Sequence, residues 1–264
     1  MNIVVCIKQT PDSAAKIAVD GGQVTWGDAP LVVNPWDEFA VEEALRTKEK
    51  HGGKVTAVCM GVETAREALK TALAMGCDEA ILVSDPALKG CDSLGTARVL
   101  AGAIRKAGEV DAVFFGRQAI DSDTGLTAGQ VARLLGWPAL TYVAAITDWK
   151  PAEKAVSVQR MIDEGRQVVE SSLPAVISVS KEINEPRYPS FMGIRKASKT
   201  TIPVWSLADI GVAADQVGET GARVGWAEMY APPARKVVCE IIKGETPEET
   251  AAALVDRLIA EKVI

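Results

Sequence analysis

Small and polar residues follow three of the predicted buried strands in the first half of the chain. They are Cys6, Lys8 and Gln9 after the first strand, Cys59, Met60 and Gly61 after the second, and Gly116, Arg117, Gln118 and residues 121–127 after the fourth. Glycines at such ends let a ligand approach the backbone, and the free amides that begin a helix at Thr127 can hold a phosphate. Because ligands of parallel sheets bind beyond the carboxyl ends of the strands, these residues predict a nucleotide site.

The same residues are also compatible with a protein that binds nothing there. Polar loops are the usual connections of any α/β fold, and the chain contains neither a Walker phosphate-binding sequence nor a GxGxxG motif. Met60 and the cysteines are equally compatible with core packing. From the residues alone, solvated turns and a nucleotide site remain open alternatives.

Residues for acid–base, nucleophilic or metal chemistry are sparse. The five cysteines are widely spaced and never form a CxxC pair, so we expect neither a disulfide framework nor a metal site. His51 is the only histidine, and it lies beside Gly52 and Gly53 at the end of a predicted helix, where we expect it to face solvent. No catalytic residue is therefore predicted.

Charge and hydropathy limit the class of protein. The chain has 264 residues, 29 of them Lys or Arg and 35 Asp or Glu, and its net charge of −6 leaves no basic surface suited to nucleic acid. No apolar run is long enough for a membrane span, and the N-terminal MNIVVCIKQTPD lacks the basic leader and apolar stretch of a signal peptide. We therefore expect a cytoplasmic protein with no nucleic-acid partner and no membrane insertion.

Strands alternate with helices through the first half of the chain. Predicted strands cover 1–8, 54–61, 79–84 and 111–116, and predicted helices cover 37–50, 64–76, 93–108 and 127–136. A hairpin is predicted at 16–26, where Asp20, Gly21 and Gly22 supply the turn. This alternation predicts an α/β fold with a doubly wound, mostly parallel sheet.

Beyond about residue 146 the alternation ends. Three strands are predicted there: an antiparallel pair at 155–162 and 166–172, and a buried strand at 174–180. We expect residues 1–210 to form one nucleotide-binding α/β domain. The remainder, 211–264, is rich in glycine and proline before a terminal helix, and we expect it to pack on the same domain or on another chain.

The segment INEPRYPSFMGIRKASKTTI, residues 183–202, has a composition typical of a contact surface. It combines two prolines, a tyrosine, a phenylalanine and a methionine with four cations. Apolar side chains among cations suit a transient interface, since the apolar group supplies a hot spot and the charges speed the encounter. The alternative is that Phe191 belongs to the core and the cations are an ordinary solvated face.

Several stretches of the chain resemble one protein family. VQRMIDEGRQVVESSLPAVIS, from Val158 to Ser178, resembles the signature of the electron-transfer flavoprotein beta subunit, and VSKEINEPRYPSF continues it. The resemblance extends over nearly the whole chain through MNIVVCIKQTPD, NPWDEFAVEEALR, TALAMGCDEAILVSD and FFGRQAIDSDT. Neighbouring folds of the superfamily, such as stress proteins and ATP pyrophosphatases, lack the motifs of the second half.

The resemblance implies an adenine nucleotide alpha-hydrolase-like, Rossmann-like fold and a heterodimer. In that family the alpha subunit holds most of an FAD, the beta subunit covers it from the other side, and residues 211–264 would then pack on the alpha subunit. The beta subunit itself holds either AMP or a second FAD. Carried over to this chain, the cofactor-binding residues are Cys6, Asn34, Pro35, Trp36, Asp37, Met60, Gly61, Gly116, Gln118, Asp121, Asp123, Thr124, Gly125, Leu126 and Thr127.

One loop bears on the choice between AMP and a second FAD. AMP-binding relatives resemble Asp-Asp-x-Asn-Gln-Thr-Gly-Gln there. Relatives that hold a second FAD and carry out electron bifurcation, called bifurcating relatives here, resemble Gly-Asp-Thr-Ala-Gln-Val-Gly-Pro-Gln. This chain has SDTGLTAGQ at 122–130, in which Asp123 and Thr124 match the bifurcating type while Leu126 and Thr127 depart from it. NPWDEFA is closer to the AMP type, and GETGARVG departs from the bifurcating pattern. The loop favours FAD, and with it an NADH-dependent bifurcating complex.

Two residues of this loop are expected to have different roles. Thr124 is expected to donate its hydroxyl to a phosphate oxygen at the start of the following helix. Asp123 is expected to organise the loop without contacting phosphate, because a carboxylate beside a phosphate is repulsive.

The resemblance also identifies 183–202 with the family's recognition loop, which docks on an acyl-CoA dehydrogenase through one apolar side chain. By position that side chain is Phe191, which implies a place in fatty acid oxidation. The partner-binding residues are then Tyr188, Phe191, Met192, Ile194, Lys196 and Lys199. Two alternatives stay open: a hydrolase of the same fold, which needs a glycine-rich phosphate loop and a base, and a structural or sensing module that binds only AMP.

Overall fold

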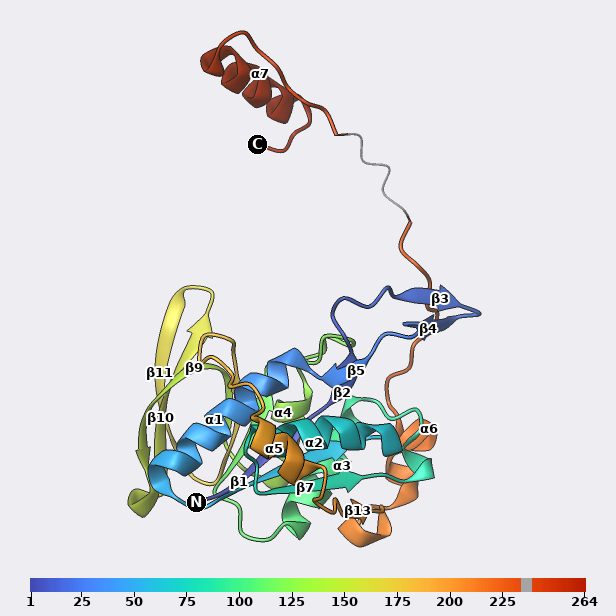
Figure 1. The fold of residues 1–264 in the computed structure, drawn as a ribbon, viewed down its shortest axis with the longest axis vertical. Coiled ribbons are helices and arrows are strands. Elements are labelled where there is room, and N and C mark those ends of the chain that lie inside the picture. Colours follow the sequence, from blue (N-terminus) through green and yellow to red (C-terminus); the bar gives the residue numbers. More distant parts are fainter. Residues whose placement is uncertain (234–238) are drawn as a thin grey trace. The chain divides into compact units, whose positions relative to one another are not determined.

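The computed structural model describes residues 1–233 and 239–264. Its largest sheet has nine strands in the order β11-β10-β9-β12-β8-β1-β6-β7-β13 (Figure 1). These strands are β1 (Asn2–Ile7), β6 (Lys54–Met60), β7 (Glu79–Val83), β8 (Ala112–Gly116), β9 (Ala139–Lys150), β10 (Ala155–Ile162), β11 (Gly165–Ser172), β12 (Ala175–Val179) and β13 (Val204–Trp205). Two short pairs stand apart from it: β2 (Gln9–Pro11) with β5 (Leu31–Val33), and the predicted hairpin, β3 (Ala18–Asp20) with β4 (Gln23–Thr25).

Seven α-helices are present in the described ranges. They are α1 (Pro35–His51), α2 (Arg66–Met75), α3 (Ser93–Lys106), α4 (Thr127–Leu135), α5 (Phe191–Ala197), α6 (Gly218–Gly221) and α7 (Pro247–Ala260). Short 3-10 turns are η1 (Glu63–Ala65), η2 (Pro86–Leu88), η3 (Pro151–Glu153), η4 (Ala208–Ile210) and η5 (Ala214–Gln216). The four long helices expected in the first half of the chain are all found.

The neighbouring strands β9-β12-β8-β1-β6-β7-β13 all run parallel. Strands β10 and β11 extend the sheet beyond β9 as antiparallel neighbours. Successive residues of a strand point to opposite faces, and the two faces of β1 have different neighbours. Ile3 and Val5 belong to the core that includes α1 and α2, whereas Val4 and Cys6 belong to the core that includes α3 and α4. The predicted doubly wound α/β fold is confirmed.

Strand β9 was not predicted. No strand was expected between the helix that ends near residue 136 and the strand at 155–162, yet β9 covers Ala139–Lys150. Tyr142 lies in this strand with φ +57, and the pairing of β9 with both β10 and β12 shifts register nearby. Such an irregularity interrupts the alternation of apolar and polar residues, which is the signal that marks a strand in a sequence.

The first compact unit ends later than expected. It covers Met1–Met229, and the second covers Tyr230–Ile264, whereas we expected a boundary after residue 210. Residues 211–229 stay with the sheet domain because their backbone bonds to it: the Gly218 N–H donates to Cys91 Sγ at 3.0 Å and the Arg223 N–H donates to Asp92 at 2.7 Å.

The second unit contains α7, the predicted terminal helix. Thr246 caps it by accepting the Glu249 N–H at 3.2 Å, and Pro247 stands at its first position. None of its residues is buried. The part of the expected arm at 234–238 lies outside the described residues, and packing of the arm on an alpha subunit stays a prediction.

His51 is less exposed than expected. It ends α1, but its ring lies 6.4 Å from the Trp149 ring in an edge-on contact, and its Nε2 is buried. Burial and the nearby charges of Lys50 and the N-terminus lower its pKa. His51 is therefore a neutral packing residue at pH 7.

The contrast between the core and the sheet edge gives a first prediction. Phe114 on β8 is completely buried, whereas Val168 on the edge strand β11 is 68% exposed. Phe114→Ala should lower the free energy of unfolding by about 3 to 5 kcal/mol, because it leaves a cavity in the core. Val168→Ala should change it by less than about 0.5 kcal/mol. Urea unfolding of both variants measures the difference, and equal losses would contradict this description of the core.

Candidate functional site

The carboxyl ends of β8, β1 and β6 lie next to one another, because these strands are neighbours and run parallel. Gly116, Ile7 and Met60 are their last residues. The segments that follow them therefore meet at one edge of the sheet, where α1 also begins. This edge is the candidate nucleotide site.

Asn34 connects the entrance of α1 to the loop after β8. Its amide nitrogen donates to the Gln118 carbonyl at 2.9 Å, and its amide oxygen accepts the Ile120 N–H at 3.1 Å. Pro35 follows at the first helical position, where a missing N–H costs little. Asn34 is 1% exposed, so its side chain fixes the loop to the helix.

Asp37 is a buried carboxylate in the first turn of α1. It accepts the backbone N–H of Lys8 at 2.8 Å and that of Gly116, and it is 7% exposed. Burial raises its pKa from 3.8 to about 7, against the opposing effect of these hydrogen bonds. A side chain at Gly116 would collide with Asp37 and with the Trp36 backbone. The lack of a side chain at Gly116 therefore lets the start of α1 lie close to the end of β8, and the ligand contact expected at Gly116 stays a prediction.

Two polar contacts hold the loop between β8 and α4. Lys8 Nζ forms an ion pair with Asp121 at 2.7 Å, and Gln118 Nε2 donates to Asp123 Oδ1. Asp123 has φ +54, a left-handed conformation that aspartate adopts more readily than most residues. Its carboxylate is thus engaged within the loop, in agreement with an organising role.

The N-terminus of α4 has unpaired donors suited to an anion. Leu126 stands at the capping position, and none of the described side chains caps the helix. Gly125 has φ +61, and a side chain there would meet only the Arg117 carbonyl at 3.7 Å, so the approach is open. The first amides of α4 can therefore donate to a phosphate beside Thr124 and Thr127.

The cysteines at this edge are core residues. Cys6 and Cys59 are 3% and 0% exposed, and burial raises the pKa of each thiol, for Cys59 to about 12. Neither is a thiolate at neutral pH, so neither is a nucleophile. Met60 is partly buried against the core below, and Gly61 donates its N–H to the Val83 carbonyl at 3.0 Å.

Arg117 and Tyr142 belong to this region although they are not among the predicted binding residues. The Arg117 guanidinium carbon lies 5.5 Å from the centre of the Trp36 ring and 5.1 Å from that of Tyr142, within range of cation–π attraction. Arg117 Nε is buried without a hydrogen-bond partner among the described residues. The position of Arg117 directly after a strand could have indicated a place in this site. Nothing in the sequence indicates that β9 brings Tyr142 close to Arg117.

The residues predicted to bind a partner lie on and beside α5 (Phe191–Ala197), which is a helix and not the loop we expected. Tyr188, Phe191, Met192 and Ile194 are 94%, 80%, 67% and 54% exposed. The alternative in which Phe191 belongs to the core is therefore wrong. Lys196 and Lys199, at and just beyond the end of the helix, add positive charge beside these apolar side chains.

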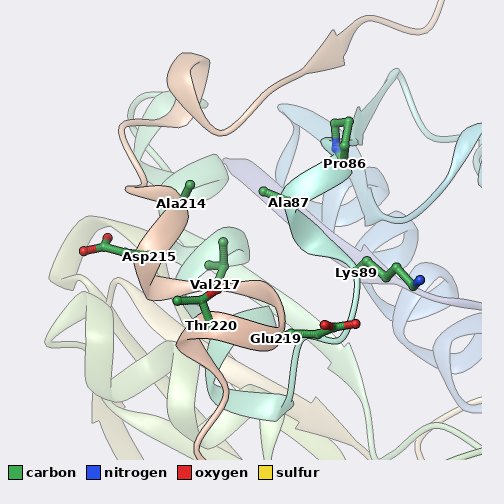
Figure 2. Close-up of a pocket in the computed structure, with 8 residues that line it drawn as sticks. All are labelled: Pro86, Ala87, Lys89, Ala214, Asp215, Val217, Glu219 and Thr220. Atoms are coloured by element: carbon green, nitrogen blue, oxygen red, sulfur yellow. The ribbon is translucent and has the colours of Figure 1, made fainter.

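A separate open depression lies beyond β7 (Figure 2). Its side chains come from η2 and from the segment around η5 and α6, and they include both Lys89 and Glu219. None of the residues that line it belongs to the predicted nucleotide shell.

Within residues 1–233 and 239–264, no group of three or more His, Cys, Asp or Glu side chains could hold a metal ion. In the same ranges no helix has the length and apolar character that crossing a membrane requires.

Comparison with known proteins identifies the family. A family model described as the electron transfer flavoprotein domain matches residues 26–210. The chain is 39% identical over 266 residues to caffeyl-CoA reductase-Etf complex subunit CarD of Acetobacterium woodii, with 100% of both chains covered. The chain belongs to the electron transfer flavoprotein family. This membership confirms the resemblance read from the motifs.

Other relatives indicate the type of subunit. The chain is 38% identical over 267 residues to electron transfer flavoprotein subunit beta of Thermoanaerobacterium thermosaccharolyticum, with 100% of both chains covered. It is 37% identical over 268 residues to protein FixA of Azotobacter vinelandii, covering 99% of this chain and 95% of that one. The chain is thus a beta-subunit-like electron transfer protein, and beta subunits of this family pair with an alpha subunit.

The raised pKa of Asp37 predicts a pH dependence of stability. Between pH 4 and 7 the unfolded chain ionises this carboxyl while the folded chain keeps it protonated, so its contribution to stability is present at low pH and is lost as the pH rises. Asp37→Asn should abolish that loss and gain up to about 4 kcal/mol relative to the wild type over this window. Urea unfolding at pH 4.5 and 7.5 measures it, with Asp163→Asn at the exposed β10–β11 turn as the control. A parallel pH dependence in the Asp37→Asn variant and the wild type would contradict the assignment.

Proposed function

We propose that the chain is the beta subunit of a heterodimeric electron transfer flavoprotein that carries electrons, through an FAD shared with the alpha subunit, between an acyl-CoA dehydrogenase and a second redox partner. The observation that carries this proposal is the meeting of three strand ends beside the uncapped start of α4 in a chain of this family. When bound, flavin supplies the electron transfer, and the protein supplies position and electrostatics.

The strand-end site suits an adenine nucleotide. The first amides of α4 and the Thr124 hydroxyl are donors for a phosphate, and Gly125 leaves the approach open. Asn34 holds the loop after β8 in place through buried hydrogen bonds, and Asp37 holds the end of β1 by accepting the Lys8 N–H. Lys8 is paired with Asp121, which leaves the helix amides and the Arg117 guanidinium as positive features of this region.

We propose a second FAD as the nucleotide of this site, and hence a bifurcating, NADH-dependent complex. Asp123 and Thr124 support this choice because they match the corresponding loop of bifurcating relatives. AMP is the second candidate, favoured by the sequence NPWDEFA at the start of α1. In that case the chain would serve as a simple carrier, or as a structural or sensing module that binds only AMP.

The exposed side chains of α5 suit a transient partner. Phe191 and Met192 offer an apolar anchor, and Lys196 and Lys199 lie next to it. One relative, CarD, is named as a subunit of a complex with a caffeyl-CoA reductase. This name supports a partner that acts on CoA thioesters, and we propose an acyl-CoA dehydrogenase.

Ligand analysis of the purified alpha–beta complex tests the nucleotide proposal. Mass spectrometry of the released ligands should find two FAD per heterodimer; one FAD and one AMP would instead support the simple carrier. Thr124→Val should weaken retention of the beta-site nucleotide by about 1 to 2 kcal/mol, roughly a 5- to 30-fold higher Kd, since one phosphate hydrogen bond is lost. The shared FAD should stay bound. Thr25→Val, in the exposed hairpin, is the control, and loss of both ligands or of neither would contradict the site.

Replacement of Phe191 tests the docking proposal. Phe191→Ala should lower kcat/KM for electron transfer with the acyl-CoA dehydrogenase about tenfold or more, as expected for a buried hot-spot side chain. Its flavin content and thermal stability should match those of the wild type, because the side chain contacts solvent in the free protein. Val204→Ala, an exposed apolar residue on β13, is the matched control. Equal activity of the two variants would exclude Phe191 as an anchor.

A further inference from the structure

The docking helix α5 turns its large apolar side chains outward, so they do not hold it on the protein. It has seven residues, and a helix this short is not stable by itself in water. Figure 1 shows that it lies beside α2, and the two helices are in contact. Contacts other than those of Phe191 and Met192 must therefore fix its place.

Packing fixes the inner face and the far end of α5. Ala197 and Ile202 are 2% and 5% exposed, and Arg66 Nη1 donates to the Ile202 carbonyl at 2.7 Å. Gly193 lies so close to the Ala74 carbonyl that a side chain would collide with it. These contacts lie within and after α5, so other contacts must hold the residues that lead into the helix.

Arg187 holds the entering chain against α1. Its guanidinium donates to Glu42 at 2.7 and 3.1 Å and to Glu49 at 2.5 and 3.0 Å, and its backbone N–H donates to Glu42 at 3.2 Å. One planar guanidinium thus binds two carboxylates, each through two hydrogen bonds. Arginine suits this geometry and lysine does not, because lysine presents a single point charge.

Glu42 is a buried carboxylate at 2% exposure. Burial alone would raise its pKa, but hydrogen bonds from Arg187 and Arg46 outweigh burial and hold the pKa below its ordinary value. Glu42 therefore stays ionised at neutral pH, and the ion pair with Arg187 persists. Glu49, the second carboxylate, is 53% exposed in its side chain and forms the outer half of the clamp.

Other residues restrict the same stretch of chain. The Asn184 amide donates to the Phe39 carbonyl at 3.0 Å and to Glu43 at 3.1 Å. Pro186 and Pro189 stand on either side of the Arg187 position, and each fixes its own φ angle. The chain therefore enters α5 with little freedom at the point where the clamp acts.

We propose that Arg187, held by Glu42 and Glu49, is a positioning residue that keeps the docking helix α5 in the conformation the redox partner binds before that partner arrives. This inference rests on the proposed docking function of α5. Arg187 acts through the backbone: its guanidinium faces α1, while the anchor side chains begin at Tyr188. Its effect is to lower the ordering cost that a mobile segment would pay on binding.

The test uses the complete alpha–beta complex and two variants. Glu49→Gln removes the exposed half of the clamp and leaves the buried pair intact, whereas Arg187→Lys keeps the charge and loses the forked geometry. Amide hydrogen exchange at Ile194 and Ser198, both bonded within the segment, should become about fivefold faster or more in each variant. KM for the complex with its acyl-CoA dehydrogenase should rise about three- to tenfold with kcat unchanged, because only the formation of the docked state is affected.

Controls separate positioning from general destabilisation. Glu79→Gln removes a comparable exposed ion pair, Lys54 with Glu79, and should change neither quantity. Flavin content should be the same in every variant. Unchanged exchange of α5 in Glu49→Gln and Arg187→Lys, with Phe191→Ala still impaired, would overturn the positioning role alone. Normal electron transfer in Phe191→Ala would overturn the docking function itself.

Discussion

The burial of the first turn of α1 at the carboxyl edge of the sheet is the constraint on which both candidate surfaces depend. Asp37 accepts backbone N–H groups from Lys8 and Gly116, so one carboxylate joins the ends of two neighbouring strands to a helix. This arrangement is possible only because position 116 has no side chain. Asn34, one residue before the helix, extends the junction to the loop that leads to α4.

The same helix then supports the docking segment at its other end. Glu42 and Glu49 lie on one face of α1, two turns apart, and together they receive Arg187. A single helix thus contacts the proposed nucleotide site through its N-terminus and the start of α5 through its middle and last turns. At a rise of 1.5 Å per residue, Glu42 lies about 8 Å and Glu49 about 18 Å from Asp37 along the axis of α1.

The sequence was informative wherever one residue type or one period decides the structure. Runs such as NIVVCI predicted buried parallel strands, and Thr246 with Pro247 predicted the start of the terminal helix. The sequence was uninformative where contacts between residues far apart in the chain decide the structure. Glu42 looks like a surface residue of a helix, and its burial becomes tolerable when Arg187, remote in sequence, joins Arg46 as a partner. Strand β9 was not predicted, and neither was the contact of its residue Tyr142 with Arg117, because no residue pattern marks the positive φ of Tyr142.

The two buried carboxylates of α1 show that burial raises a pKa unless charged partners oppose it. Asp37 has dipolar N–H partners and a pKa of about 7, since burial outweighs them, whereas Glu42 has two guanidinium partners and a lowered pKa. The difference between the two pKa values is consistent with the surroundings of each residue. With a pKa of about 7, Asp37 carries less negative charge near neutral pH than an ordinary aspartate, which reduces its repulsion of a phosphate expected at this edge. An ionised Glu42 is needed where Arg187 must be held, because a neutral carboxyl would leave that guanidinium only partly paired.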